Sequence, residues 1–401
     1  MNKKKSIRKC PICQEENGEI LHTQKFVLPE GHPLSNGYDI LCCDRCGFVY
    51  ADTTVSQKDY DIFYAKLSKY EDKKTATGGG ESPYDAARLQ KTAECIAEFL
   101  PDKSVRILDI GCANGGLLGY LKKLGYNNLC GLDPSPACVE NTKQLYGIEA
   151  YAGSIFTPPQ DLGDFDLVIL SHVLEHIQDL KFSVKLIEQL IKVGGYLYVE
   201  VPNASGYVDH VFAPFQDFNT EHINHFYHPH LSNLLIQFGL TNKLIGEKVF
   251  EVSPGMSYPA IYSFWQKQES NSSELVIAQD KMLKQRILLY IESSKKIMTD
   301  IDIKLQSVLE DAADVIVWGT GQLAMKLLAE TSLAKANIVA FVDGNPINQG
   351  SVISGITVLS PHQIQLREMR QPIIVTSILS QEAIYNAIQK MALPNQVILL
   401  R

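Results

Sequence analysis

The chain has 401 residues, 45% hydrophobic and 20% charged, which is enough for two or three globular domains with separate cores. Its formal net charge of -8 disfavours a nucleic-acid-binding protein, because such proteins usually present a basic surface to phosphates. The basic start Met1–Lys5 is not followed by an apolar stretch typical of a secretion signal or a membrane span, so no membrane association and a cytoplasmic location are expected.

Two Cys-x-x-Cys pairs stand near the start of the chain, Cys10 with Cys13 and Cys43 with Cys46. Two thiolates at this spacing can bind one metal ion, and two such pairs complete the tetrahedral four-thiolate site of structural Zn2+. Residues 1–72 are therefore predicted to form a zinc-binding module, in which the metal replaces a hydrophobic core too small to fold alone.

Other interpretations of these cysteines remain open. The four thiols could meet the spacing by chance, and Cys42 is a spare neighbour that complicates the assignment. Disulfides are disfavoured because nine cysteines cannot all pair. Cys95, Cys112, Cys130 and Cys138 also lie in apolar or loop settings typical of reduced thiols.

Helical and strand patterns alternate through the middle of the chain. Apolar residues recur at helical spacing over 85–100. Four short apolar runs read as strands at 105–110, 129–133, 165–170 and 196–201. Such runs are typical of parallel strands covered on both faces, so an α/β domain is predicted over 73–265.

The last third of the chain repeats this design. A linker and connecting helix are predicted over 266–310, and a second strand, glycine turn, helix and strand then lead to Asp343. A second Rossmann-like domain is therefore predicted over 311–401. Its turn Gly319–Gly321 could bind a nucleotide, but Lys and Arg are sparse there, which favours a structural or substrate-clamping role.

The first glycine loop follows the strand at 105–110 and reads Asp109-Ile-Gly111-Cys-Ala113-Asn-Gly115. It lacks the Gly-x-Gly-x-x-Gly spacing that places a pyrophosphate at a helix amino terminus. Asp-x-Gly-x-Ala-x-Gly instead resembles motif I of the class I S-adenosylmethionine-dependent methyltransferases, with Ala113 where Gly is commoner. The resemblance covers about residues 105–205 and implies a Rossmann-like core that binds S-adenosylmethionine.

The resemblance also implies the residues that contact the cofactor. Asp133 would accept hydrogen bonds from both ribose hydroxyls, a role that suits the two oxygens of a carboxylate. The position that contacts the adenine edge in the family falls at Ser154 and Ile155, with Ser154 where Asp is usual. Ser171 is the last residue that the resemblance implies for cofactor binding. The implied cofactor residues are Asp109, Gly111, Ala113, Gly115, Asp133, Ser154, Ile155 and Ser171. The alternative for Asp133 is a cap of the following helix.

Two further patterns in the sequence resemble motifs of other enzyme classes. His172-Val-Leu-Glu-His176 matches the H-x-x-E-H pattern of some zinc peptidases. It follows a strand and lacks a third ligand motif, whereas Leu-Glu-His-Ile after the fourth strand is common in methyltransferases. Glu200-Val-Pro-Asn203 has the wrong order for the Asn-Pro-Pro-aromatic tetrad of amide and adenine N-methylation.

A second histidine-rich segment, Glu221–His228, contains three histidines and a carboxylate. Because His titrates near neutral pH, His222 is a candidate general base, with Glu221 orienting it or binding substrate hydroxyls. The alternative is a set of solvated or capping histidines, or an adventitious metal site.

The order of these modules resembles the deoxysugar C-methyltransferases, which act on nucleotide-linked 4-keto sugars. The resemblance implies that Glu221 and His222 are the catalytic pair and that His176 and Tyr70 contribute to catalysis. His222 would remove a proton beside the ketone, and Tyr70 or His176 would stabilise the enolate oxygen. Two positions before Glu221 the family pattern has an aromatic residue, whereas this chain has Asn219. This departure leaves open which sugar is the substrate and which atom is methylated.

Three rival functions remain at this stage. An O- or N-methyltransferase acting on a sugar or another small metabolite would use His222 on a hydroxyl or amine. A zinc-ribbon RNA methyltransferase is disfavoured by the acidic charge. A non-catalytic binding protein is disfavoured by the intact Asp109, Gly111, Gly115 and Asp133.

Overall fold

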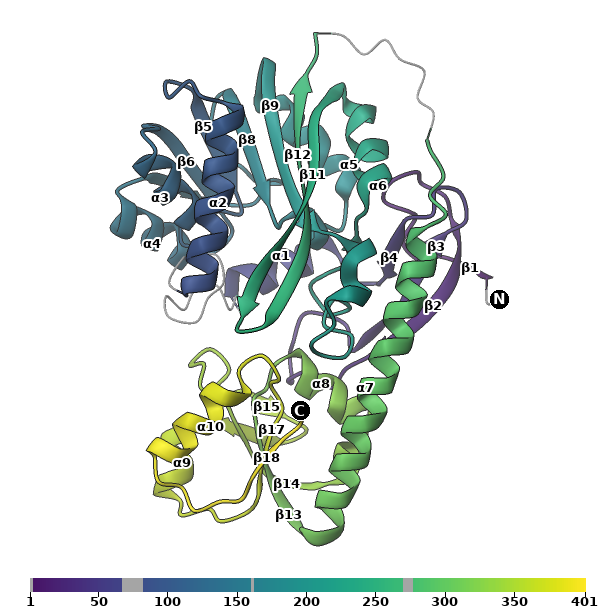
Figure 1. Cartoon of the computed structure of the whole chain (residues 1–401), viewed down its shortest axis with the longest axis vertical. Helices are drawn as coiled ribbons and strands as arrows, with labels where there is room; N and C mark the ends of the chain where they lie inside the picture. Colours follow the sequence, from purple (N-terminus) through teal and green to yellow (C-terminus); the bar gives the residue numbers. More distant parts are fainter. Residues whose placement is uncertain (1–2, 67–81, 160–161, 270–276) are drawn as a thin grey trace. The chain divides into compact units, whose positions relative to one another are not determined.

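A computed structural model describes residues 3–66, 82–159, 162–269 and 277–401 (Figure 1). The chain divides into two compact units. Unit 1 comprises Met1–Leu21, Ile40–His210 and Glu221–Ile287, and unit 2 comprises His22–Asp39, Val211–Thr220 and Leu288–Arg401.

A seven-stranded sheet forms the centre of unit 1, in the order β11-β12-β9-β8-β5-β6-β7. Its strands are β5 (Arg106–Ile110), β6 (Asn128–Asp133), β7 (Glu149–Ala152), β8 (Phe165–Ser171), β9 (Ile191–Pro202), β11 (Leu240–Ser253) and β12 (Met256–Lys267). The first five are parallel, and β12 and β11 add an antiparallel ribbon beside β9. The chain order reverses between β5 and β8, and such a switch point is where open α/β sheets bind ligands.

Helices cover both faces of this sheet. On one face α2 (Pro83–Phe99) and α3 (Gly116–Lys123) pack against alternate residues of the strands, among them Leu167 of β8. On the other face α5 (Leu180–Gln189) and α6 (His228–Leu235) pack against the intervening residues, among them Val168. Both faces of β8 are therefore buried, and the prediction of an α/β core with parallel strands is confirmed. The helix α4 (Pro136–Tyr146) contacts β6 and β7.

A second sheet contains the front of the chain, in the order β1-β2-β3-β4-β10. Its strands are β1 (Lys3–Lys5), β2 (Asn17–Lys25), β3 (Gly37–Cys43), β4 (Val49–Asp52) and β10 (Asn224–His225), and α1 (Gln57–Lys66) follows β4 in the chain. The edge strand β10 pairs antiparallel with β4, with Asn224 opposite Tyr50. The histidine-rich segment is thus hydrogen-bonded to the sheet that carries the cysteine pairs.

Unit 2 contains a six-stranded sheet in the order β15-β16-β14-β13-β17-β18. Its strands are β13 (Asp314–Trp318), β14 (Asn337–Val342), β15 (Val352–Ile353), β16 (Ile356–Leu359), β17 (Ile373–Val375) and β18 (Val397–Leu399). All pairings are parallel except that of β15 with β16. The helices α8 (Gln322–Glu330), α9 (Pro361–Leu366) and α10 (Gln381–Lys390) alternate with these strands along the chain.

The connecting helix expected from the sequence is α7 (Leu283–Asp311). Short 3-10 helices complete the described chain: η2 (Leu174–His176), η3 (Ala204–Asp209), η4 (Ile236–Phe238) and η5 (Ser332–Lys335).

In the part of the chain that the structure describes, we find no helix with the length and apolarity needed to cross a membrane.

Candidate active site

The two cysteine pairs lie in turns of the same kind. Gly47, directly after the second pair, has a φ of 77° and its N–H donates to the carbonyl of Cys43 over 3.0 Å. Gln14, directly after the first pair, has a φ of 63° and donates to the carbonyl of Cys10 over 2.9 Å. Both turns bend the backbone back after the second cysteine, so each pair of thiols faces the same point.

The four thiols form one buried cluster whose sulfur atoms all lie within 4.8 Å of one another. The Sγ atoms of Cys10 and Cys46 are 3.6 Å apart, and those of Cys13 and Cys43 are 3.4 Å apart. A tetrahedron with Zn–S bonds of about 2.3 Å has sulfur atoms about 3.8 Å apart. The donor set and its spacing therefore fit Zn2+.

The spare cysteine does not join this cluster. The Cys42 thiol donates toward the carbonyl of Gly47 over 3.6 Å. Burial raises the pKa of this thiol to about 12. Its direction, toward a backbone carbonyl, keeps it out of the group of four sulfur atoms.

The glycine loop after β5 adopts left-handed backbone at three alternate positions, Gly111 (φ 75°), Ala113 (φ 46°) and Gly115 (φ 78°). A Cβ on Gly115 would lie 2.6 Å from Cγ2 of Thr142, so the backbone there needs glycine. Only small residues allow such a tight loop, which suits the close approach of a cofactor that has no phosphate.

Asp133, at the end of β6, is hydrogen-bonded to this loop. Its Oδ2 accepts from the N–H of Ala113 over 2.9 Å, and its Oδ1 accepts from the N–H of Ser135 over 2.9 Å. The N-cap of α4 is Ser135, whose hydroxyl accepts from the N–H of Cys138. The N-cap of the following helix is therefore Ser135 and not Asp133, whose carboxylate lies between the glycine loop and the start of α4.

The other residues predicted to contact the cofactor lie at or close to the carboxyl ends of neighbouring strands. The N–H of Gly153 donates to the carbonyl of Asp133 over 2.9 Å, which sets Ser154 and the buried Ile155 beside the end of β6. Ser171 is the last residue of β8, and its buried hydroxyl has no hydrogen-bond partner among the described residues.

We expect Asp133→Ala to weaken S-adenosylmethionine binding by about 1–3 kcal/mol, because ribose hydroxyls and the Ala113 amide would lose their acceptor. Isothermal titration calorimetry measures this, with Glu140→Ala on the exposed side of α4 as the control. Unchanged affinity in a folded Asp133→Ala protein would mean that the ribose binds elsewhere.

Asp109 lies in β5 and is 3% exposed. Burial, and then the negative charge of Asp133, raise the pKa of Asp109 to about 8, although Arg88 opposes this. An aspartate with a raised folded-state pKa stabilises the fold fully below its unfolded pKa, and this contribution is lost as the pH rises through the folded value.

For this reason we expect the contribution of Asp109 to the free energy of unfolding to fall between pH 4 and about pH 8, so that Asp109→Asn loses less stability than the wild type over this range. Urea unfolding at a series of pH values checks the expectation, with the exposed Asp311→Asn as the control. Identical pH dependence in all three proteins would contradict the assignment.

The predicted catalytic residues that the structure describes come together in unit 1. The rings of His176 and His222 have centroids 4.9 Å apart at an angle of 67°. Nδ1 of His176 is 3.0 Å from the carbonyl oxygen of Glu221. Tyr70, the fourth predicted catalytic residue, lies outside the described residues, and the ring of Tyr64 on α1 contacts His176 edge-on at 5.7 Å.

Backbone hydrogen bonds hold the Glu221–His222 loop from two sides. The N–H of Ile223 donates to the carbonyl of Glu175 over 2.8 Å, and the carbonyl of Ile223 accepts from Ala51 over 2.9 Å. The loop therefore bridges the end of β8 and the sheet of the cysteine pairs.

The other two histidines of the segment do not join the cluster. His225 is fully buried against Tyr207, and burial lowers the pKa of His225 to about 3, so it remains neutral. His228 lies in the first turn of α6, where its Nε2 is 2.6 Å from Oε1 of Glu247. His222 alone of the three faces His176.

The residues behind this pair are not evident from the sequence. His172 lies between the carboxylates of Glu175 and Glu200, with ring nitrogens 3.2 Å and 3.1 Å from their oxygens. His172 also has a φ of 57°, uncommon for a residue with a side chain. The H-x-x-E-H match drew attention to His172 and Glu175, but nothing in the sequence paired them with Glu200.

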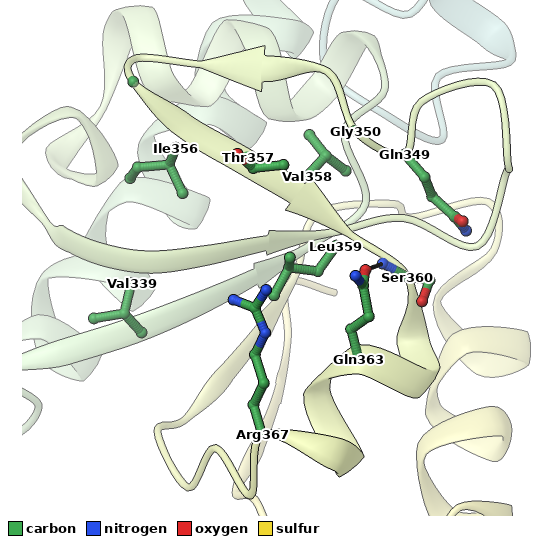
Figure 2. A pocket seen from close by; sticks show the side chains of 11 residues that line it. Val339, Gln349, Gly350, Ile356, Thr357, Val358, Leu359, Ser360, Gln363 and Arg367 are labelled. Carbon is green, nitrogen blue, oxygen red and sulfur yellow. Dashed lines mark hydrogen bonds between the residues drawn. The ribbon is translucent and has the colours of Figure 1, made fainter.

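Unit 2 has a cavity of about 740 Å³ beside β16 and α9 (Figure 2). Gln363 of α9 and Arg367, which directly follows α9, line it, and Oε1 of Gln363 accepts from the backbone N–H of Ser360 over 2.8 Å. The glycine turn 319–321 is not part of its lining.

Asp343, which follows β14, is already hydrogen-bonded within its own unit. Its Oδ2 accepts from the N–H and the hydroxyl of Thr320 and from the amide of Asn348, and its Oδ1 accepts from the N–H of Asn345. A ribose at this turn would have to compete with these donors.

Residues 84–244 match the model of a family described as Methyltransferase domain. This places the glycine loop, Asp133 and the histidine pair inside a methyltransferase domain, and the predicted class I methyltransferase core is confirmed. The matches support an enzyme of the S-adenosylmethionine-dependent methyltransferase class. Residues 312–399 match a second family model, described as C2185-like, N-terminal.

Two curated relatives align with part of the chain. Ubiquinone biosynthesis O-methyltransferase of Mesorhizobium japonicum is 31% identical over 112 residues, 26% of this chain and 43% of the relative. Ajmaline N-methyltransferase of Rauvolfia serpentina is 35% identical over 130 residues, 30% of this chain and 43% of the relative. The chain thus spans less than half the length of each.

Among solved structures, a S-adenosylmethionine-dependent methyltransferase from Methanosarcina mazei aligns with a TM-score of 0.38 at 18% identity, over 44% of this chain and 98% of that one. The [4+2]-cyclase SpnF aligns with a TM-score of 0.38 at 15% identity, over 48% of this chain and 85% of that one.

Proposed function

We propose that this protein is a S-adenosylmethionine-dependent C-methyltransferase acting on a nucleotide-linked keto sugar. The observation that carries the proposal is the edge-on contact of the imidazole rings of His176 and His222, whose centroids are 4.9 Å apart, in the unit that contains the methyltransferase core. His176 follows β8, beside the switch point of the sheet. A base at this end of the sheet suits a methyl transfer that begins with removal of a proton.

In the proposed mechanism His222 takes a proton from the carbon beside the ketone, leaving an enolate. His176 donates through Nδ1 to the carbonyl of Glu221 and, when protonated, donates through Nε2 to the enolate oxygen. Bound S-adenosylmethionine supplies the methyl group: a C–C bond forms as the C–S bond breaks, and S-adenosylhomocysteine leaves. Glu221, 4% exposed, orients the substrate or His222.

We further propose that Cys10, Cys13, Cys43 and Cys46 hold Zn2+ within a module of residues 1–72. Four thiolates leave no open coordination position, so this metal has a structural role. Residues 73–265 would be the methyltransferase domain, 266–310 the linker and helix, and 311–401 a Rossmann-like domain with a structural or substrate-clamping role. The parallel sheet of unit 2 supports the last assignment.

The experiment that tests the proposal is to locate the transferred methyl group. A panel of nucleotide sugars is first screened by thermal shift with S-adenosylhomocysteine present. Turnover of the best ligand with 13C-methyl-labelled cofactor is then followed by NMR. A methyl carbon bonded to carbon is expected, whereas a methyl ether or methylamine would overturn the proposal.

The second candidate is an O- or N-methyltransferase acting on a small metabolite. The printed names of the two curated relatives, an O-methyltransferase and an N-methyltransferase, favour it. In that case His222 would deprotonate a hydroxyl or an amine. The same NMR measurement separates the two functions.

A further inference from the structure

His172 connects the candidate active site to the interior of unit 1. Its Nδ1 is 3.2 Å from Oε1 of Glu175, and its Nε2 is 3.1 Å from Oε1 of Glu200. An ionised carboxylate can only accept a hydrogen bond, so a ring that bonds two of them donates through both nitrogens. This geometry belongs to the positively charged form of His172.

Of the two carboxylates that contact His172, that of Glu200 is held in place by further hydrogen bonds. It is fully buried, and its Oε2 is 2.6 Å from the hydroxyl of Tyr198 and 2.6 Å from Nζ of Lys248. Burial alone would raise the pKa of Glu200, but Lys248 and His172 hold it well below its usual range. Burial lowers the pKa of His172, and hydrogen bonds to Glu175 and Glu200 outweigh this and raise it.

Glu175 is the end that faces the candidate active site. It is 1% exposed, and its Oε1 is 3.9 Å from Nε2 of His176. One carboxylate oxygen of Glu175 and one ring nitrogen each of His176 and His222 all lie within 4.8 Å of one another. Oε2 of Glu175 has no hydrogen-bond partner among the described residues, and a buried acceptor without a partner is rare.

We propose that Glu175 is a positioning residue for the His176–His222 pair, and that charged His172 holds it there against Glu200. This inference rests on the proposed function for the role of His222 as the base. When His222 takes a proton it becomes positively charged, and the nearby Glu175 carboxylate favours that charged form. The positive charge of His172, which contacts the same oxygen Oε1, balances the charge of Glu175, so the carboxylate remains in place before and after proton transfer.

Other ionisable groups around the cluster come from several elements. They are Tyr60 and Tyr64 on α1, Arg88 on α2, Lys248 on β11, and Glu221 before β10. These groups are unchanged in the variants used below, so a shift in titration is attributable to the residue replaced.

The test is a histidine titration followed by NMR on full-length protein labelled with 15N in its histidine rings. His222→Asn, His176→Asn and His172→Gln assign the signals. In Glu175→Gln we expect the midpoint of His222 titration to move to lower pH by about one to two units, because a carboxylate neighbour is lost. His172→Gln should move it in the same direction by less. The control is Glu94→Gln on the exposed side of α2, which should change nothing.

The wild-type protein provides a check that needs no folded variant. At pH 7 the ring nitrogens of His172 should give the signals of a doubly protonated ring, and a neutral ring would overturn the proposal. An unmoved His222 midpoint in folded Glu175→Gln would overturn it as well. Because the titration requires no turnover, a shifted midpoint in a protein whose product carries no C-methyl group would refute the proposed function and leave the inference standing.

Discussion

Replacing His222 with Asn is expected to lower the turnover number by roughly 10²- to 10⁴-fold, while both ligands still bind. Asn keeps a polar side chain of similar reach but cannot take up a proton at neutral pH. The ring of His222 faces His176, and the backbone of the loop is held on both sides by hydrogen bonds that the substitution leaves intact. Single-turnover kinetics measure the chemical step, and calorimetry measures binding.

The control for this prediction is His228→Asn, from the same segment. His228 contacts Glu247 rather than His176, so its replacement should leave the rate close to that of the wild type.

Hydrogen exchange provides a second measurement. In deuterated water without a methyl donor, the wild type should exchange the substrate hydrogen beside the ketone for deuterium, and His222→Asn should not. A His222→Asn protein with wild-type turnover would exclude His222 as the base.

Replacing Cys13 with Ser is expected to release the metal and to lower the free energy of unfolding by about 4 kcal/mol or more, the range reached when a structural metal is lost. One bound Zn2+ per chain is expected in the wild type, because the four sulfur atoms already lie within 4.8 Å of one another. Elemental analysis and denaturant unfolding measure the two effects. Affinity for S-adenosylmethionine should change less than stability, since the glycine loop belongs to a different sheet.

Cys42→Ser is the matched control, because Cys42 neighbours a ligand in sequence but directs its thiol to the carbonyl of Gly47. This variant should keep the metal. Carefully purified wild-type protein without metal, or equal loss of metal from Cys42→Ser and Cys13→Ser, would contradict the four-cysteine assignment.

The features that could be predicted from the sequence are those fixed by a few neighbouring residues. Gly111 and Gly115 mark a tight turn because backbone with positive φ favours glycine, and the cysteine pairs mark turns that aim two thiols at one point. The parallel core followed from apolar runs such as 165–170, whose residues pack on both faces of the sheet. In each case the physical cause lies within about ten residues of chain.

The remaining features depend on how distant segments pack. His172 and Glu200 meet because the preceding residue, Ser171 of β8, pairs with Glu200 of β9, a register that no pattern in the sequence specifies. The histidine-rich segment looked uniform, yet burial separates His225 from His222 in the folded chain. The pairing of Asn224 with Tyr50 could not be predicted for the same reason.

The pairing of β10 with β4 also bears on how the protein is made. The guanidinium of Arg8 donates to the side chain of Asn224, 216 positions further along the chain. The cysteine turns can close as soon as they leave the ribosome, because each involves only a few residues. The edge of β4, in contrast, stays without its partner until most of the chain has been synthesised, and contacts between such distant residues form slowly. The loop bearing His222 is thus assembled late, and a nascent chain that stops before residue 222 lacks the candidate base altogether.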